Sequence, residues 1–473
     1  MKIEQIYTGC LAHGAYYIQS GSEIAIIDPL RETKPYTLRA LGNEGKIKYI
    51  FETHFHADFV SGHVDLAKQT GATVVFGPTA QPAFDAHVGY DGEKFQVGEV
   101  TFTLLHTPGH TMESACYLLT DKNGKDIALF SGDTLFIGDV GRPDLAQKFA
   151  GKTQDELAKI LFHSLRDKIM PLGDDIVVYP GHGAGSACGK NMSKETSDTL
   201  GHQKSQNYAL RADMTEEEFV KEVTTGLMPP PAYFPINVMM NKTGYESIDK
   251  VVKKGSRAFS AEEFEALANS TKALLLDTRK ASVFAEGFIP NSVNIGIDGS
   301  FAPWVGALIQ DTKQPILLIT EFGREEEAVY RLARVGYDNA IGYLEGGIKA
   351  WVDAGKELDT VQTISAEDFF AVKKAANDNL DILDIRKKNE YDAEHIRVAK
   401  NLPLDYINQT MDQVDKNKTY YVHCAGGYRS MIFVSILKAR GYHNLIDVKG
   451  GMGAIKETNL FSLTDYVKPV SML

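Results

Sequence analysis

An internal repeat in the second half of the chain constrains the fold more than any other feature. Three segments recur in the same order: FSAEEFEAL (259–267) as ISAEDFFAV (364–372), LLLDTRKASVF (274–284) as DILDIRKKNEY (381–391), and RVGY (334–337) as ARGY (439–442). Each copy alternates short apolar runs with helical periodicity, a pattern typical of a parallel sheet with crossover helices. The sequence therefore predicts two copies of one α/β domain with a central parallel sheet, at residues 257–357 and 362–465.

Residues 1–240 are organised differently, as short strand-like runs joined by turns. AYYIQS and EIAIID flank Gly21-Ser22, and SACYLLTD and IALFSGD flank Asn123-Gly124, two strong hairpin signals. Farther along, prolines at 229–231 and 235 exclude a regular helix, so we expect residues 228–256 to form an extended arm or linker. The chain is thus an α/β multidomain protein.

Composition excludes several function classes. A net charge of −12 argues against a general binder of nucleic acid or of anionic membranes. The first residues lack the pattern of a signal peptide, and no run approaches the ~18 apolar residues of a membrane span. Four cysteines in so long a chain do not make a disulfide framework. We expect a reduced, soluble, cytoplasmic protein.

Polar residues that suit a metal site collect at the ends of the strand-like runs in residues 1–240. IFETHFHAD, TLLHTPGHT, LFSGDT and VVYPGHG contribute His54, His56, Asp58, His110, Asp133 and His182. Nitrogen and carboxylate ligands without cysteine suit zinc, iron or manganese. Spacing alone treats His54 and His56 as equals and leaves open whether one metal or two are bound.

These motifs carry a resemblance to a known family. THxHxD followed by PGHT, SGDT and PGHG is similar to the metallo-β-lactamase superfamily, and the likeness covers residues 1–240. Within the superfamily it resembles the glyoxalase II and persulfide dioxygenase branch, and GRPDL at 141–145 favours the dioxygenases. The resemblance implies an αββα sandwich.

Residue 59 separates the two activities of that branch. The superfamily's binuclear hydrolases carry THxHxDH, but position 59 of this chain is Phe, which offers a metal no lone pair. The departure favours a single metal. The resemblance to persulfide dioxygenases then implies one Fe(II) per chain, held by His54, His110 and Asp133, with coordination positions left for substrate and oxygen.

The same resemblance gives the remaining polar residues catalytic roles. It implies that His56, Asp58 and His182 orient the ligands or position water and protons, and His56 is the first alternative as a direct ligand. Arg142 follows in GRPDL and could bind a substrate carboxylate or pair with Asp144.

The second repeat contains a reactive-cysteine pattern, YYVHCAGGYRS at 420–430. Cys424 opens a glycine-rich loop that precedes a helical run, and a helix N-terminus together with Arg429 lowers a thiol's pKa. Residues 362–465 resemble a rhodanese (sulfurtransferase) domain. That resemblance implies that Cys424 is the nucleophile carrying the transferred sulfur. It also implies a substrate cradle of Arg429 and the loop residues Ala425, Gly426, Gly427 and Tyr428.

The first repeat lacks this nucleophile. At the corresponding position it reads LLITEFGREEEAV (317–329), without cysteine and rich in glutamate. We predict a rhodanese-like domain at 257–357 without sulfurtransferase activity. Its expected role is as a spacer, in dimerisation or in docking.

Together these features predict a persulfide dioxygenase joined to a sulfurtransferase. A low-molecular-weight persulfide, such as glutathione persulfide, would react with O₂ and water to give sulfite and a thiol. Cys424 would interconvert sulfite and thiosulfate. The alternatives are a glyoxalase II-like thioester hydrolase fused to a sulfurtransferase, and a sulfur carrier whose metal is only structural. The sequence leaves open the thiol carrier, the direction of sulfur transfer and the oligomeric state, for which the family resemblance implies a homodimer or tetramer.

Overall fold

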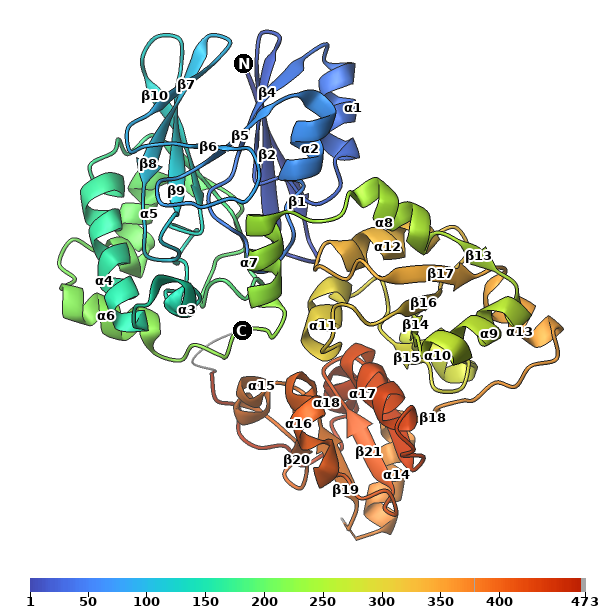
Figure 1. Ribbon diagram of the computed structural model, residues 1–473. Coiled ribbons are helices and arrows are strands. Elements are labelled where there is room, and N and C mark those ends of the chain that lie inside the picture. Colours follow the sequence, from blue (N-terminus) through green and yellow to red (C-terminus); the bar gives the residue numbers. More distant parts are fainter. Residues whose placement is uncertain (378, 469–473) are drawn as a thin grey trace. The chain divides into compact units, whose positions relative to one another are not determined.

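The computed structural model describes residues 1–377 and 379–468. It consists of two compact units, an N-terminal unit, Met1–Ile248 with Arg334–Gly336, and a C-terminal unit, Asp249–Ala333 with the described residues from Tyr337 onward. Figure 1 draws the N-terminal unit in blue to green and most of the C-terminal unit in yellow to red. Among the described residues, no helix combines the length and the apolar character needed to cross a membrane.

The first sheet of the N-terminal unit has six strands in sequence order. They are β1 (Lys2–Thr8), β2 (His13–Ser20), β3 (Glu23–Ile27), β4 (Lys46–Phe51), β5 (Thr73–Phe76) and β6 (His87–Val88). β1 to β3 pair antiparallel, and β3 to β6 pair parallel. Two helices, α1 (Lys34–Gly42) and α2 (His63–Thr70), supply Tyr36, Ala40 and Leu66 to the core on its outer face.

The second sheet of this unit also has six strands. They are β7 (Lys94–Val97), β8 (Val100–His106), β9 (Ala115–Thr120), β10 (Asp126–Gly132), β11 (Val177–Pro180) and β12 (Asp198–Thr199). Between β10 and β11 lie α3 (Gln147–Ala150), α4 (Gln154–Ser164) and the π-helical turn η1 (Leu165–Ile169), and after β12 follow α5 (Leu200–Gln206), η2 (Tyr208–Leu210) and α6 (Glu216–Thr224). Leu161, Leu200 and Phe219 from these helices share a core with strands β9 to β11.

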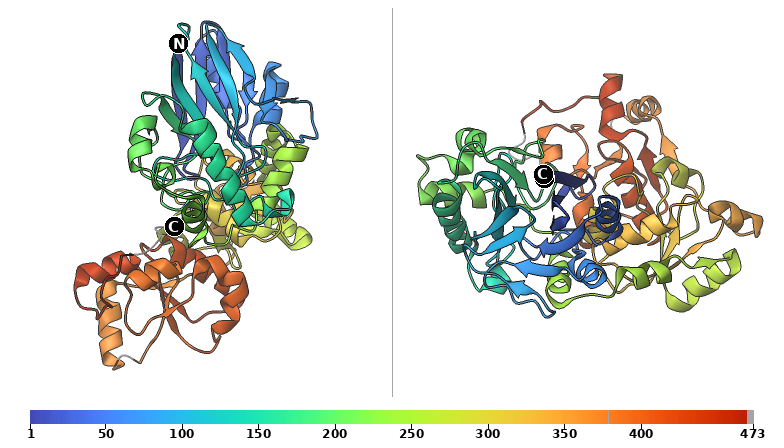
Figure 2. Two further views of the ribbon diagram at one scale, coloured as in Figure 1. Left: turned by 90° about the vertical axis from the view of Figure 1, so that its left-hand side faces the viewer. Right: turned by 90° about the horizontal axis from the view of Figure 1, so that it is seen from above.

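Large apolar side chains fill the space between the two sheets. Phe51 of the first sheet lies against Phe102 and Tyr117 of the second, with ring centroids 5.1 and 4.5 Å apart. All three are buried, and burial of such a side chain stabilises the fold by about 1.5–3 kcal/mol. With helices on both outer faces, as Figure 2 shows, the layers are α-β-β-α, which confirms the predicted sandwich.

Local sequence signals explain several of these elements. The predicted hairpin at Gly21 joins β2 to β3, and the predicted turn at Gly124 joins β9 to β10; both glycines have a positive φ. Helix α4 begins with a capping box, in which Thr153 and Glu156 satisfy each other's backbone N–H groups.

The prediction of an extended arm over residues 228–256 is wrong for most of its length. Helices α7 (Phe234–Thr243) and α8 (Ile248–Gly255) occupy it. Pro235 lies in the first turn of α7, where the missing N–H has no partner to lose. The side chain of Asn241 donates to the carbonyl oxygens of His56 and Phe59, both at 2.8 Å, so α7 braces the loop that carries the first histidines.

The C-terminal unit contains the two predicted parallel sheets. The first has the order β13-β17-β16-β14-β15, with β13 (Ala258–Phe259), β14 (Leu274–Asp277), β15 (Val293–Asn294), β16 (Ile316–Ile319) and β17 (Ala340–Leu344). The second has the order β18-β22-β21-β19-β20, with β18 (Gln362–Ile364), β19 (Asp381–Asp384), β20 (Lys400–Asn401), β21 (Tyr420–His423) and β22 (Leu445–Val448). The two orders are equivalent, as two copies of one module require. Residues 257–357 are called the Cys-less module below, and residues 362–465 the cysteine module.

Helices accompany each sheet. In the Cys-less module they are α9 (Ala261–Thr271), α10 (Ala281–Glu286), α11 (Phe301–Leu308), α12 (Glu325–Ala333) and α13 (Gly347–Asp353). In the cysteine module they are α14 (Ala366–Ala375), α15 (Lys388–Ala393), η3 (Leu404–Tyr406), α16 (Ile407–Thr410), η4 (Met411–Gln413), α17 (Tyr428–Lys438) and α18 (Gly451–Thr458).

The repeat extends to buried polar contacts. Asp277 and Arg279 form a two-pronged ion pair in the first module, and Asp384 and Arg386 form the same pair in the second. Each module therefore contains the same buried ion pair.

Candidate functional site

The six predicted histidine and aspartate residues all follow strands of the N-terminal unit. His54, His56 and Asp58 lie in the loop after β4, His110 follows β8, Asp133 follows β10 and His182 follows β11. Every one of them is buried. Strands of the two facing sheets end at the same edge of the sandwich, so residues that are far apart in sequence come together there.

His54, His110 and Asp133 form one candidate ligand group. One ligand atom from each lies within 4.8 Å of the other two. The Nε2 atoms of His110 and His54 are 3.4 and 3.9 Å from Asp133 Oδ2. Two imidazoles and one carboxylate in this arrangement are suited to a divalent transition metal.

In His54 and His110, the hydrogen bond made by Nδ1 determines which ring nitrogen is available to bind a metal. His110 Nδ1 lies 2.8 Å from the carbonyl oxygen of Arg142 and must donate to it. His54 Nδ1 lies 3.0 Å from Thr53 Oγ1, whose own proton goes to Asp28 Oδ2 at 2.8 Å. Both imidazoles therefore carry their proton on Nδ1 and present the Nε2 lone pair toward Asp133.

The electrostatics of this group fit a bound cation. Both Asp133 oxygens are buried without a hydrogen bond among the described residues. Burial and the carboxylates of Asp58 and Asp28 raise the pKa of Asp133 well above its usual value. Burial lowers the pKa of His110 to about 4 and that of His54 well below its ordinary value, so both imidazoles are neutral. A divalent metal would compensate the buried carboxylate and use both lone pairs.

A second group, His56, Asp58 and His182, also has ligand atoms within 4.8 Å of one another. His182 Nε2 is 3.3 Å from Asp58 Oδ2, and its Nδ1 lies 3.2 Å from the carbonyl oxygen of Ala12. Burial raises the pKa of Asp58 to about 6. Phe59 is fully buried, and its ring centroid is 4.4 Å from that of His56, so a hydrocarbon ring occupies the space beside this second group.

Three further buried residues belong to this region, and the sequence analysis missed them. His56 Nε2 lies 3.2 Å from Asp28 Oδ1 and 3.5 Å from Glu52 Oε2, and His13 Nε2 lies 2.9 Å from the carbonyl oxygen of Asp28. Asp28 follows β3 and Glu52 follows β4, the same strand-end position that identified the other residues. That position was the available signal. Asp28 also has a φ of 47°, unusual for a residue other than glycine.

Cys188 lies beside the first group. Its Sγ is within 4.8 Å of ligand atoms of Asp133 and His182. Burial and the nearby carboxylates of Asp58 and Asp133 raise the pKa of its thiol well above the ordinary value. The Cys188 thiol is therefore neutral and can act as a weak hydrogen-bond donor. We assign it no further function.

Arg142 is held inside the N-terminal unit. Its guanidinium forms two hydrogen bonds of 2.7 Å with Asp144 and donates to the carbonyl oxygens of Ala187 and Met228. The sequence left open whether Arg142 binds a substrate carboxylate or pairs with Asp144, and in the structure it pairs with Asp144. Its link to the metal centre is the carbonyl oxygen that orients His110.

A cavity of about 510 Å³ reaches the first ligand group. His110 lines it, together with apolar residues such as Phe55 and, from α7, Phe234 and Pro235. A small thiol-bearing molecule fits a cavity of this size. The segment predicted as a linker thus forms a wall of the cavity.

In the C-terminal unit, the loop after β21 surrounds the thiol of Cys424. The N–H of Gly427 donates to Sγ at 3.1 Å, and the thiol lies 3.6 Å from Ser430 Oγ. The carbonyl oxygens of Cys424 and Ala425 accept from the N–H groups of Met452 and Gly453 at the start of α18. The carbonyls are thus tied back, and the Gly427 amide before α17 is left to face an anionic sulfur.

Two residues predicted for the substrate cradle are engaged elsewhere. The Arg429 guanidinium forms two hydrogen bonds with Glu390, at 2.5 and 2.8 Å. The Tyr428 hydroxyl donates to the carbonyl oxygen of Gly296 at 2.7 Å. Both side chains therefore fix the loop, and the loop's backbone is what faces the sulfur.

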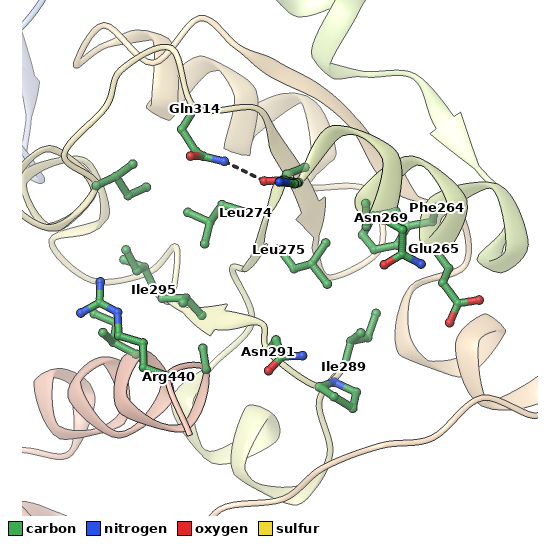
Figure 3. Close-up of a pocket in the computed structure, with 18 of the residues that line it drawn as sticks. Phe264, Glu265, Asn269, Leu274, Leu275, Ile289, Asn291, Ile295, Gln314 and Arg440 are labelled. Carbon is green, nitrogen blue, oxygen red and sulfur yellow. Dashed lines mark hydrogen bonds between the residues drawn. The ribbon is translucent and has the colours of Figure 1, made fainter. Parts of the chain in front are cut away.

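The corresponding loop of the Cys-less module holds Thr320, Glu321 and Phe322 after β16. Arg324 in this loop pairs with Glu327 and Asp298. A cavity of about 960 Å³ in the C-terminal unit lies between the start of β14 and the end of α17 with the residues that follow it, as Figure 3 shows for Leu274, Leu275 and Arg440. None of its lining residues belongs to the Cys424 loop.

Comparisons with known proteins agree with this architecture. A model of the metallo-beta-lactamase superfamily matches residues 8–182, and a model of the rhodanese-like domain matches residues 260–354 and 371–458. A crystal structure of a metallo-beta-lactamase from Staphylococcus aureus subsp. aureus COL is 30% identical, with a TM-score of 0.63 over 73% of this chain and 98% of that one.

Curated relatives fall into two enzyme groups. Hydroxyacylglutathione hydrolase of Tolumonas auensis is 33% identical over 35% of this chain and 60% of its own length, so the chain spans less than two thirds of that relative. Human persulfide dioxygenase ETHE1 is 28% identical over 46% of this chain and 78% of its own length. The chain belongs to the metallo-beta-lactamase superfamily, in the branch that includes these enzymes, and joins that domain to two rhodanese-like domains.

Proposed function

We propose that the protein is an iron-dependent persulfide dioxygenase with a thiosulfate sulfurtransferase activity in the same chain. The observation that carries the proposal is the buried His54–His110–Asp133 group, together with Phe59 beside His56 of the second group. Phenylalanine leaves the second group without the further histidine that a binuclear hydrolase would need at that position. A single metal with unfilled coordination positions is the arrangement used for oxygen chemistry.

The overall reaction of the first site is balanced by one oxygen molecule and one water. R–S–SH, O₂ and H₂O give R–SH and sulfurous acid, so the outer sulfur is oxidised and O₂ is reduced. Fe(II), when bound, supplies the centre at which persulfide sulfur and O₂ can react. The protein holds the two Nε2 atoms in place through the hydrogen bonds of Thr53 and of the Arg142 carbonyl oxygen.

Neighbouring residues handle water, protons and the substrate body. Asp58 and His182, 3.3 Å apart, can share a proton next to the ligand group. The cavity lined by Phe55 and α7 receives the thiol carrier and excludes bulk water from its apolar wall.

The second site transfers sulfur through Cys424. Its thiolate attacks the outer sulfur of a persulfide, the S–S bond breaks and R–S⁻ leaves with a proton from water. Sulfite then attacks the outer sulfur of the Cys424 persulfide, which forms thiosulfate and returns the thiolate. The Gly427 N–H, 3.1 Å from Sγ, stabilises the anionic sulfur at both stages. The steps are reversible, so thiosulfate can also supply the sulfur.

A thioester hydrolase remains the second candidate, because hydroxyacylglutathione hydrolases are as similar to the N-terminal unit as the persulfide dioxygenase is. To separate the two, metal-free protein is loaded with Fe(II) or with Zn(II) in the absence of oxygen and is then assayed in oxygenated buffer with glutathione persulfide or S-lactoylglutathione. We expect the Fe(II) protein, and not the Zn(II) protein, to consume O₂ when it is given the persulfide. Thioester hydrolysis with Zn(II), without O₂ uptake with Fe(II), would favour the hydrolase.

A further inference from the structure

The helix that follows the Cys424 loop has no polar face. Residues 430–437 of α17 are all buried, Ser430 and Ser435 among them. A helix that covers one face of a sheet normally keeps a polar outer surface. The corresponding helix of the Cys-less module, α12, does so: it begins with Glu325, Glu326 and Glu327 and buries only its other face. Something other than solvent must therefore cover the outer face of α17.

The Cys-less module covers that face, through its edge strand β15, which contacts α17. The N–H of Asn294 in β15 donates to Ser435 Oγ at 3.0 Å. At the far end of the helix, Lys438 Nζ reaches Asp359 Oδ1 at 3.1 Å and the carbonyl oxygen of Thr360 at 2.9 Å, in the segment that joins the modules. The sheet edge and the helix thus satisfy each other's exposed groups.

The contact continues to the first residue of α17. The Tyr428 hydroxyl donates to the carbonyl oxygen of Gly296. A Cβ placed on Gly299 would lie 2.4 Å from Tyr428 Cζ and 2.5 Å from Cε2, and one on Gly296 would lie 3.2 Å from Cε2. Gly299 does not have a positive φ, so its backbone accepts other residues and only the ring requires glycine there. The ring occupies a notch in the backbone of the Cys-less module.

The notch that holds the Tyr428 ring is next to the Gly427 amide, which donates to the Cys424 sulfur. Gly427, which precedes Tyr428, donates its N–H to Cys424 Sγ at 3.1 Å. On the near side of the loop, α18 holds the carbonyl oxygens of Cys424 and Ala425. A Cβ on Gly426 would meet nothing within 4 Å, so packing does not hold the tip of the loop. Tyr428 is the anchor on the far side.

We propose that the Cys-less module supports the Cys424 loop, and that Tyr428, seated between Gly296 and Gly299, is a positioning residue for that loop. The inference rests on the proposed sulfur transfer by Cys424. It assigns the module a task in that reaction, in place of spacing or docking. The ring fixes the first turn of α17, and the turn fixes the Gly427 amide against the thiolate.

The test uses the full-length protein and the variants Gly299→Ala, Tyr428→Phe, Tyr428→Ala and the double variant Gly299→Ala/Tyr428→Ala. Sulfur transfer from thiosulfate gives kcat and KM, and the pH dependence of Cys424 alkylation by iodoacetamide reports the thiolate. We expect Gly299→Ala to displace the ring, to lower kcat between about tenfold and a hundredfold, and to move the alkylation profile to higher pH. Tyr428→Phe keeps the ring and should lie between wild type and Gly299→Ala.

The double variant separates the notch from a general loss of structure. Once the Tyr428 ring is gone, the added methyl group of Gly299→Ala has nothing to displace, so the double variant should match Tyr428→Ala in kcat and in alkylation profile. An additive loss in the double variant, or a Gly299→Ala protein with wild-type kcat and profile, would overturn the proposal. O₂ uptake at the other unit should be unchanged in Gly299→Ala. If wild type itself transfers no sulfur, the proposed function fails, while the alkylation profiles still test the notch.

Discussion

Replacing Asp133 by asparagine should change stability in opposite directions in the metal-free and metal-loaded protein. The carboxylate is 2% exposed, and neither oxygen has a hydrogen-bond partner among the described residues. Without metal, Asp133→Asn removes a buried carboxyl group that must lose its water or take up a proton on folding, so the free energy of unfolding should rise by on the order of 1–3 kcal/mol. A metal at about a thousand times its Kd adds about 4.1 kcal/mol to wild type, which exceeds that rise, and this gain should be lost in the variant.

The measurement must report on the N-terminal unit. Both tryptophans, Trp304 and Trp351, lie in the Cys-less module, so their fluorescence follows the other unit. Hydrogen exchange of peptides from β4 and β10, with chelator and with Fe(II) under nitrogen, gives the required free energies.

Asp139 provides a matched control, because it is equally buried but fully bonded. Its carboxylate accepts hydrogen bonds from the N–H groups of Val140, Lys190 and Asn191 and from the hydroxyl of Tyr208. Asp139→Asn should lower stability by on the order of 2–3 kcal/mol in both states and keep the metal gain. The reasoning would be refuted if Asp133→Asn behaved like Asp139→Asn.

Three further predictions concern other residues. Phe59→His places an imidazole beside His56 of the second group, so the metal content measured by mass spectrometry should rise from one to two per chain; an unchanged content would contradict the role given to Phe59. Cys424→Ser should abolish thiosulfate exchange and leave persulfide-dependent O₂ uptake intact, and loss of both in a folded variant would contradict separate sites. Burial raises the pKa of Asp447 from 3.8 to about 6, so its contribution to stability is complete below about pH 4 and is lost as the pH rises through 6. Asp447→Asn should therefore gain on the order of 2–3 kcal/mol over wild type between pH 4 and 7 in urea unfolding, and parallel pH profiles would count against it.

The sequence predicted the features that are written locally. The repeat predicted two sheets of equivalent strand order, and hairpin signals predicted β2–β3 and β9–β10. Residues at strand ends predicted the group around Asp133, because strand ends in a layered fold meet at one edge of the sheet.

Features that depend on distant packing were not accessible. Pro235 excluded a helix only on the assumption that it lay inside one, whereas it begins α7. His13 faces Asp28 and lies near Phe59 only because β2 and β3 pair beside the loop after β4, and nothing in the sequence around it indicates a partner. Tyr428 was assigned to the substrate cradle from its place in the loop, and the partner of its side chain could not be foreseen because it comes from the other module.

The central claim is that the N-terminal unit oxidises persulfide sulfur with O₂ at an iron centre. Protein purified without oxygen is analysed for iron, supplied with glutathione persulfide, and followed for O₂ consumed and for sulfite plus thiosulfate formed. The account predicts about one iron per chain and one sulfite or thiosulfate for each O₂ consumed, with both signals lost in His54→Ala. Sulfur transfer without O₂ uptake in an iron-loaded protein would contradict it.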